Sequence, residues 1–195
     1  TEPADILNHV VDRTRSAKQK HDHVFLVGHS MGSAISLLTS TFVQVDGLVM
    51  GGPHFKTTYR WWYLLPPETW ANTVGRALPM VYKTDAYIQV NRRDVKDDIV
   101  SYRFIPVSGG LAAMHFAENA RHPETLAMVT CPVLLLHGRD DSAASPSAAA
   151  KAFEKIGSDD KEFVWLKESD HHIYWDYERE AVYAKILAFI AEHTD

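Results

Sequence analysis

The sequence of 195 residues contains a single cysteine, Cys131, so it forms no internal disulfide and offers no cysteine-based zinc site. The chain has no excess of positive charge, because its 20 Lys and Arg residues are outnumbered by 25 Asp and Glu residues, and its net charge is −5. No basic cluster is interleaved with aromatic residues, which argues against nucleic-acid binding. No apolar run reaches the roughly 18 residues of a membrane span, and the start of the chain, TEPADILNHV, lacks a signal-peptide pattern. These absences predict a soluble, cytoplasmic protein.

Helix-like and strand-like segments alternate near both ends of the chain. The length and the 46% of hydrophobic residues fit one domain with a sizeable core. Short continuous apolar runs such as HVFLVG (23–28) indicate strands buried on both faces, and their alternation with helices predicts an α/β fold with a mainly parallel sheet. The expected elements are helix 3–19, strand 23–28, helix 31–42, strand 45–52, strand 131–138, helix 145–157, strand 161–169 and helix 178–193.

Residues 53–128 do not show this alternation of helix-like and strand-like segments. The stretch YRWWYLLPPETW (59–70) is rich in aromatic residues and proline, and alternating apolar and charged patches follow it. We therefore expect a single domain, 1–195, whose core is formed by 1–52 and 129–195 and whose insertion at 53–128 forms a cap of short helices over the sheet.

The segment VFLVGHSMGSAIS (24–36) carries the strongest chemical signal. An apolar strand runs into Gly28-His29-Ser30-Met31-Gly32 and then into a helix of small residues. A nucleophilic serine at such a junction needs a very tight turn, and small residues at positions 28 and 32 would let the chain turn without clashes. The helix N-terminus, with the N–H of Met31, would face negative charge developing on a substrate oxygen. The alternative is a purely structural turn.

A serine nucleophile needs a base that is oriented by an acid. Both residue types follow the next strands of the predicted sheet: Asp140 and Asp141 come after the strand that ends at Gly138, and His171 and His172 come after the following strand. The order Ser, Asp, His is that of α/β-hydrolases. The residue types alone leave both pairs open.

These segments together resemble the monoacylglycerol lipase and carboxylesterase group of α/β-hydrolases. GHSMG is similar to the nucleophile elbow of that group, PVLLLHGRDD to its acid strand ending in His-Gly-x-x-Asp, and KESDHHIYWDYERE to its closing Ser-Gly-His segment followed by Asp-x-Glu. The resemblance implies an α/β-hydrolase fold and hydrolysis of carboxylic esters, such as acylglycerols, through an acyl-enzyme. It selects Ser30 as nucleophile, Asp141 as acid and His171 as base, with Met31 in the oxyanion hole, and it implies no cofactor and no metal.

The chain departs from the family pattern at Asp170, where the group has glycine. A carboxylate beside the base would change the loop conformation and raise the pKa of the base. The remaining histidines are expected to be structural: His137 satisfied at its strand end, His21 and His23 without a metal role, and His54, His115 and His122 packed at the surface or in the cap.

The aromatic residues of the insertion have two readings of equal weight. Trp61, Trp62 and Trp70 either form the core of the cap or line an acyl-binding wall, because such pockets are apolar and rich in aromatic side chains.

The second oxyanion donor of this fold comes from a loop that precedes the helix at 3–19, and the sequence contains no such loop. We expect about 60 further residues to supply it, by typical element lengths. Strand 24–28 would then be an open sheet edge, which points to truncation, to a complementing segment or to self-association, the first two being favoured. Two rival functions follow: an inactive fragment that acts as an assembly partner, and a peptidase or acyltransferase that uses the same triad.

Overall fold

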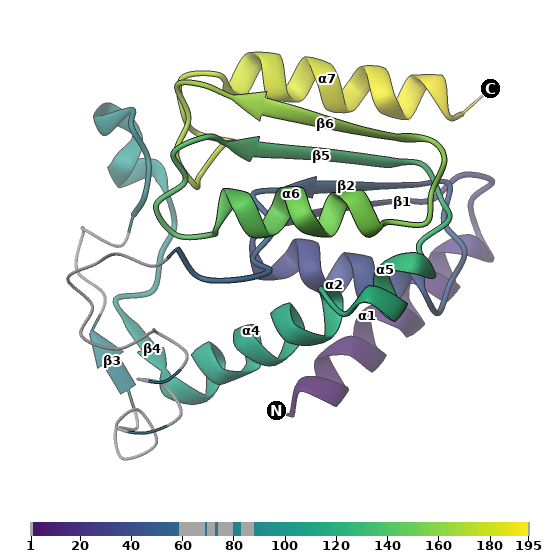
Figure 1. Cartoon of the computed structure of the whole chain (residues 1–195), viewed down its shortest axis with the longest axis horizontal. Helices are drawn as coiled ribbons and strands as arrows, with labels where there is room; N and C mark the ends of the chain where they lie inside the picture. The colour runs from purple at the N-terminus through teal and green to yellow at the C-terminus, as the bar shows by residue number, and fades with distance from the viewer. Residues whose placement is uncertain (1, 59–68, 70–72, 74–79, 83–87, 195) are drawn as a thin grey trace.

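A four-stranded parallel sheet forms the centre of the protein. The computed structural model describes residues 2–58, 69, 73, 80–82 and 88–194 (Figure 1). The strand order is β1-β2-β5-β6, and each neighbouring pair is parallel, as the sequence predicts. The strands are β1 (Phe25–His29), β2 (Gly47–Gly51), β5 (Val133–Gly138) and β6 (Lys161–Leu166).

Helices cover both faces of this sheet (Figure 1). Side chains of β5 alternate between the two faces: Leu135 joins the core under the larger helix group, whereas Leu134 and Leu136 join the core under α7. The sheet is therefore the middle of three layers. The helices are α1 (Pro3–Lys18), α2 (Met31–Ser40), α4 (Val107–Ala120), α5 (Pro123–Ala127) and α6 (Pro146–Lys155) on one face, and α7 (Arg179–Glu192) on the other.

The two inner strands and the outer strand β1 differ in burial. Every residue of β2 and β5 is buried, as expected from their apolar runs. In β1 only Gly28 is buried and Val27 is 50% exposed, so the prediction that this strand is buried on both faces is wrong. The physical reason is position: β1 lies at the end of the sheet, and no strand of the described residues pairs with its outer side.

The segment 53–128 contains both helices and strands in its described part. β3 (Met80–Tyr82) and β4 (Phe104–Pro106) form an antiparallel pair, and η3 (Arg93–Asp98) is a short 3-10 helix. The longer helix α4 packs against α2 and contributes Phe116 to the main core. Because residues 59–68 and several others lie outside the described residues, the division into core and cap stays a prediction.

None of the helices in the described part of the chain has the length and apolar character needed to cross a membrane.

Candidate active site

Ser30 lies alone between the end of β1 and the start of α2. Its backbone has φ 54° and ψ −120°, and among the described residues it is the one non-glycine residue with positive φ. This conformation costs about 1–3 kcal/mol for a residue with a side chain. Backbone hydrogen bonds hold it in place: the Ser30 N–H donates to Gly51, and the Ser30 carbonyl accepts from Ser33 and His54.

The two glycines of the turn are not equivalent. A Cβ atom at Gly28 would lie 2.6 Å from backbone atoms of Gly32 and Ser33, so the tight turn requires glycine there, as predicted. A Cβ at Gly32 would meet no atom within 4 Å. The expectation that Gly32 prevents a clash is therefore wrong. A side chain at position 32 would point into open space and not toward the strand.

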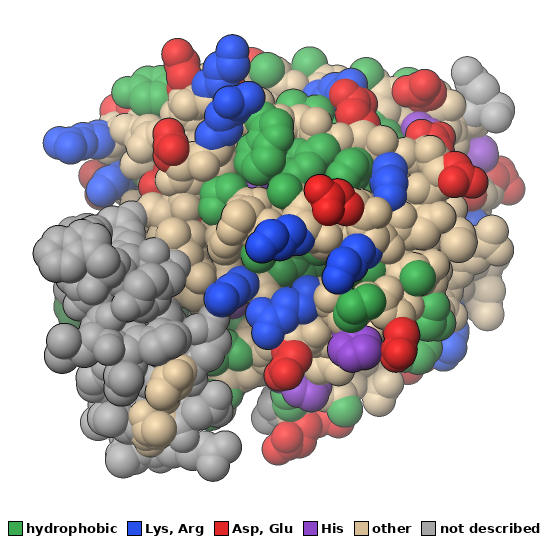
Figure 2. Space-filling view, viewed as in Figure 1, with side chains coloured by type: hydrophobic (Ala, Val, Ile, Leu, Met, Phe, Trp, Pro, Cys, Tyr) green, Lys and Arg blue, Asp and Glu red, His purple; other side chains and the backbone are tan. Residues whose placement is uncertain are grey.

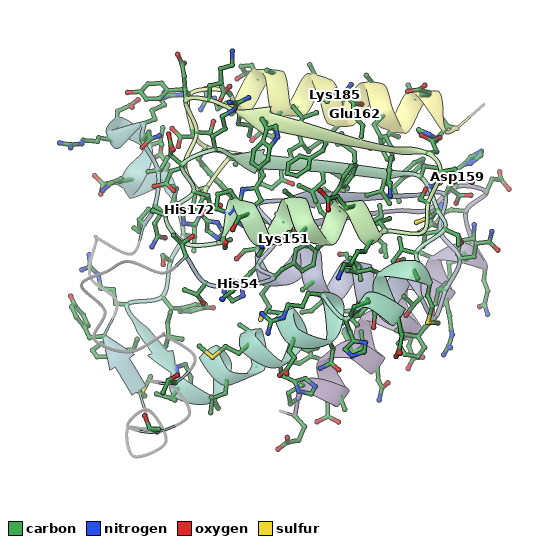
Figure 3. All side chains as sticks on the ribbon, viewed as in Figure 1. His54, Lys151, Asp159, Glu162, His172 and Lys185 are labelled. Carbon is green, nitrogen blue, oxygen red and sulfur yellow. The ribbon has the colours of Figure 1, made fainter. Side chains whose placement is uncertain are left out.

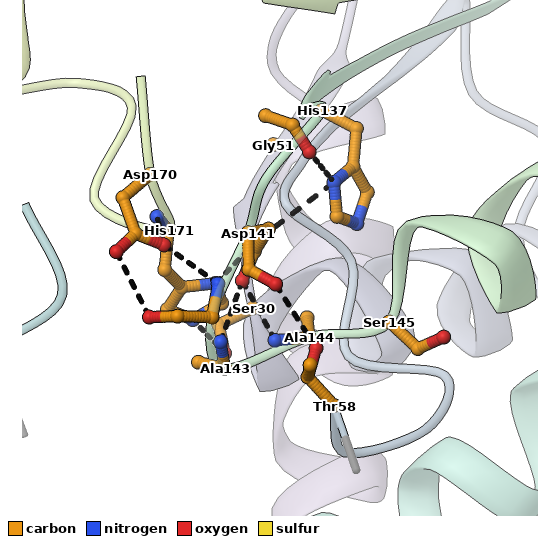
Figure 4. A network of polar contacts seen from close by, with 12 residues as sticks. Ser30, Gly51, Thr58, His137, Asp141, Ala143, Ala144, Ser145, Asp170 and His171 are labelled. Carbon is orange, nitrogen blue, oxygen red and sulfur yellow. Dashed lines mark hydrogen bonds and ion pairs between the residues drawn. The ribbon is translucent and has the colours of Figure 1, made fainter. Parts of the chain in front are cut away.

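The structure brings Ser30, His171 and Asp141 together in one hydrogen-bonded row (Figure 4). His171 Nε2 lies 2.9 Å from Ser30 Oγ, and His171 Nδ1 lies 2.9 Å from Asp141 Oδ2. The three residues follow the carboxyl ends of β1, β5 and β6, where parallel strands deliver their loops to one edge of the sheet. Asp141 and His171 are both buried.

The neighbouring candidates lie elsewhere. Asp140 is exposed, and the backbone N–H of His172 donates to Gln89. The His172 ring packs against His29, with the ring centroids 5.5 Å apart. The geometry therefore places Asp141 and His171, the members selected by the family resemblance, next to Ser30.

The environment of Asp141 favours its charged form. Its Oδ1 accepts hydrogen bonds from the backbone N–H groups of Ala143 and Ala144, at 2.8 and 2.7 Å. Burial alone would raise the pKa of Asp141, but the hydrogen bond and the charge of His171 outweigh it and lower the pKa below its ordinary value. A carboxylate anion at Nδ1 fixes the proton of the imidazole on that nitrogen, so that Nε2 accepts the Ser30 hydroxyl proton.

His29 is a residue of the site that the sequence argument left without a role. Its Nε2 lies 2.9 Å from the carbonyl oxygen of His171, and its ring packs 4.9 Å from the His171 ring. Burial, and then the positive charge of His171, lower the pKa of His29 to about 4. His29 is therefore neutral at pH 7, and its Nε2–H donates to the base's own backbone. The sequence signal that could have pointed to His29 is its position directly before Ser30 in the motif Gly28-His29-Ser30-Met31-Gly32.

His137 also belongs to the site, and the expectation that it is satisfied at the strand end is only half correct. Its Nδ1 lies 3.0 Å from the Gly138 carbonyl oxygen and 3.7 Å from Asp141 Oδ2. Its Nε2 is buried with no hydrogen-bond partner among the described residues. Burial is the largest influence on this imidazole and lowers its pKa, so His137 presents a neutral ring to the Asp141 carboxylate.

Asp170 joins the loop of the base to the loop of the acid. Its two carboxylate oxygens accept hydrogen bonds from the backbone N–H of Ser142 at 2.7 Å and from the Ser142 hydroxyl at 2.8 Å. Oδ1 also accepts from the backbone N–H of His171. The carboxylate that replaces the family glycine thus contacts backbone and hydroxyl groups around the base.

The Asp-x-Glu pair, Asp176 and Glu178, holds this loop from its other side. Both carboxylates accept hydrogen bonds chiefly from backbone N–H groups, and Asp176 is completely buried. The resemblance contained this motif, but only the structure shows its purpose. The donors to Asp176 are the N–H groups of Asn91, Arg92, Asp170 and Tyr177, and the donors to Glu178 are the N–H groups of Lys167 and Glu168 and the Ser169 hydroxyl.

The remaining predicted residues have different outcomes. Met31 is the first residue of α2, and its N–H has no acceptor among the described residues. Trp61, Trp62 and Trp70 lie outside the described residues. Within the part of the chain that the structure describes, no group of three or more His, Cys, Asp or Glu side chains could hold a metal ion.

Comparison of the sequence with known proteins identifies a matching family and a related lipase. The family model described as "Serine aminopeptidase, S33" matches residues 4–178. A thermostable monoacylglycerol lipase of Bacillus sp. (strain H-257) is 26% identical over 177 residues, which cover 90% of this chain. The chain spans 66% of that lipase, just under two thirds of its length.

Solved structures share the same fold. One, reported for the metagenome-derived lipolytic enzymes LipS and LipT, has a TM-score of 0.83 at 22% identity, covering 99% of this chain and 75% of the other. The monoacylglycerol lipase of Paleococcus ferrophilus has a TM-score of 0.81 at 20% identity, covering 100% of this chain and 77% of the other.

Proposed function

The chain belongs to the Hydrolase_4 family (Serine aminopeptidase, S33) and has the α/β-hydrolase fold expected from its sequence; on that premise we propose that it hydrolyses carboxylic esters through Ser30, His171 and Asp141. The observation that carries the proposal is the row of two 2.9 Å hydrogen bonds from Ser30 Oγ through His171 to Asp141. A serine–imidazole–carboxylate row of this geometry activates a hydroxyl for attack on an acyl carbon.

The reaction proceeds in two halves. Ser30 Oγ attacks the ester carbonyl carbon while His171 Nε2 takes its proton, and the Asp141 carboxylate stabilises the imidazolium that forms. The N–H of Met31 donates to the oxyanion of the tetrahedral intermediate. When the intermediate collapses, His171 protonates the leaving alcohol and an ester to Ser30 remains. Water, deprotonated by His171, then attacks this acyl-enzyme and releases the carboxylic acid and free Ser30.

Acylglycerols or similar esters are the substrate class that we propose. The support is the named activity of the Bacillus relative and of the Paleococcus protein, both monoacylglycerol lipases. We propose that Trp61, Trp62 and Trp70, which belong to the insertion at 53–128, line the acyl pocket. Soluble medium-chain monoacylglycerols are therefore the first substrates to test.

Peptide hydrolysis is a second candidate, because the matching family model carries the description of a serine aminopeptidase. The same triad cleaves amides when the site accepts a leaving amine. The test compares release from p-nitrophenyl esters, monoacylglycerols and amino-acid p-nitroanilides, with Ser30→Ala as the inactive variant and Ser40→Ala as the matched control. We expect turnover of the esters alone. Faster turnover of the anilides would assign a peptidase, and absence of both turnover and fluorophosphonate labelling would contradict the hydrolase proposal.

A further inference from the structure

A cavity lies beside α6. Its volume is about 770 Å³, within the range of ligand pockets, and none of Ser30, Asp141 and His171 lines it. We call it the basic cavity. Its lining residues come from the segment after β2, the end of α4, α5 and the whole length of α6: Lys56, Thr57, Thr58, Arg121, Leu126, Ser145, Pro146, Ser147, Ala148, Lys151, Ala152 and Lys155.

Among the described residues, four cations and no carboxylate line the basic cavity. Lys56, Arg121, Lys151 and Lys155 converge from three segments, although the whole chain carries a net charge of −5. On the face shown in Figure 2, blue Lys and Arg side chains gather near the centre, and Figure 3 places Lys151 on α6. None of the four forms an ion pair with a carboxylate of the described residues. All four side chains are exposed to solvent, where water and salt screen their mutual repulsion, and their like charge favours an anion at the cavity.

Other polar groups at this cavity are also suited to an anion. The first turn of α6, a helix of 10 residues, forms part of the wall, and helix N-termini favour negative charge. Ser145 caps the helix through its side chain and Ser147 adds a hydroxyl donor. Arg121 is held in place because its guanidinium donates to the Phe55 carbonyl at 2.9 Å.

The floor of the basic cavity is attached to the loop of the catalytic acid. Ser145 N–H donates to the Lys56 carbonyl at 2.8 Å, and Thr57 forms an antiparallel bridge with Ala144. The Thr58 hydroxyl donates to the Asp141 carbonyl at 3.0 Å. These contacts give the cavity a fixed backbone frame.

An adjoining, smaller cavity of about 210 Å³ shares Lys56 and Arg121 with the basic cavity. It also contains His54, which Figure 3 shows below α6, and the carboxylate of Glu118. Two of the four cations of the basic cavity, Lys151 and Lys155, lie one helical turn apart on α6.

We infer that the basic cavity binds a phosphate-bearing ligand. A phosphate dianion presents several acceptor oxygens, which matches several cationic and hydroxyl donors better than the two oxygens of one carboxylate. The apolar residues Leu126, Pro146 and Ala152 provide a surface for the organic part of the ligand. The phosphate belongs either to a soluble phosphate ester or to the headgroup of an anionic phospholipid, and this site is separate from the proposed ester hydrolysis.

The test measures binding of defined probes to the full chain at low ionic strength. Glycerol 3-phosphate and inorganic phosphate are titrated by calorimetry and by amide NMR, with succinate as the carboxylate probe. Phosphatidylcholine vesicles with and without phosphatidic acid test the lipid source. The double variant Lys151→Gln/Lys155→Gln removes two cations from the cavity, and Lys20→Gln/Lys96→Gln removes the same charge elsewhere. Circular dichroism checks the fold of both.

We expect saturable binding of a phosphate probe or of the anionic vesicles, with amide shifts centred on residues 145–152. The cavity variant should bind about tenfold more weakly, because each exposed charge contact contributes a factor of a few, and the control variant should bind like the wild type. Binding to free phosphates identifies a soluble ester, and binding to anionic vesicles alone identifies a lipid headgroup. No saturable binding of any probe, equal binding by the cavity variant, or equal binding of succinate would each overturn the inference.

Discussion

His29 Nε2 lies 2.9 Å from the backbone carbonyl oxygen of His171, and the two residues are 142 positions apart in the chain. This contact joins the residue before Ser30 to the backbone of His171. The loops that carry Ser30 and His171 are therefore connected twice, once by this contact and once by the Ser30–His171 contact. Since the low pKa of His29 keeps its ring neutral, the bond is a donation from Nε2–H to a carbonyl. We therefore expect His29 to position His171, the proposed base.

Replacement of His29 should lower kcat more than it changes KM. His29→Leu removes the donor and frees the His171 backbone, and a misplaced catalytic group costs about 10²-fold in rate. His29→Gln keeps an N–H near the Nε2 position and should recover most of the loss. Steady-state kinetics on a p-nitrophenyl ester would measure both variants. Equal losses in the two variants would show that ring packing, rather than the hydrogen bond, is what His29 supplies.

Stability should fall in mild acid because of His29. Its pKa is about 4 in the folded protein against 6.5 in a model peptide, so between these values the unfolded chain binds more protons. Unfolding free energy should therefore decrease as pH falls from about 6.5 to 4, by roughly 3 kcal/mol for this shift. His137, whose pKa is also lowered, acts in the same direction.

Urea unfolding at several pH values measures this dependence, and His29→Gln is the comparison variant. The variant should show a smaller decrease over the same range, since it lacks one of the two imidazoles whose pKa is lowered. Identical pH dependence in the two proteins would contradict the assignment to His29.

Ser30→Ala and Ser30→Gly should separate catalysis from backbone strain. Both variants should lose ester hydrolysis by about 10⁴ to 10⁶, the cost of removing a triad nucleophile. Glycine adopts positive φ without penalty, so Ser30→Gly should be more stable than Ser30→Ala by about 1 kcal/mol. Thermal unfolding beside the kinetic assay tests this. A less stable glycine variant would mean that the φ of 54° carries no strain.

The neighbouring acids and histidines provide matched controls for one another. Asp141→Asn and His171→Ala should each reduce kcat by about 10³ or more, as losses of triad members do. Asp140→Asn should change it by less than about threefold, because the Asp140 side chain is exposed. His172→Ala should cost far less than His171→Ala, because the His172 ring packs beside the His171 ring, with the centroids 5.6 Å apart, but is not a member of the row of hydrogen bonds. Comparable losses within either pair would contradict the assignment of roles.

The open side of β1 should promote self-association. An edge strand presents unpaired N–H and C=O groups, and Val27 beside them is 50% exposed. Val27→Lys places a charge at this edge and should shift the protein toward monomer in light-scattering measurements. Val100→Lys is the control, since Val100 is 96% exposed on a different segment. Association that is unchanged by Val27→Lys would exclude the β1 edge as the contact.

Several features were available from the sequence because they depend on short-range order. The apolar runs at 45–52 and 131–138 predicted buried strands, which the structure has at 47–51 and 133–138, and the small residues after Ser30 predicted a helix that begins at Met31. These patterns reflect which residues can be buried on a strand or on one helix face. The choice of Asp141 and His171 over their neighbours came from the family resemblance and not from residue type.

Tertiary structure decided the features that join distant segments. The open space at Gly32 cannot be read from the local pattern, because it depends on what lies beside the turn, whereas the place of β1 at a sheet edge was expected from the order of the strands in the sequence. The His29–His171 bond and the four cations of the basic cavity arise where loops from separate strands and helices meet. Side-chain periodicity determines which residues face inward; the path of the whole chain determines which of them come into contact.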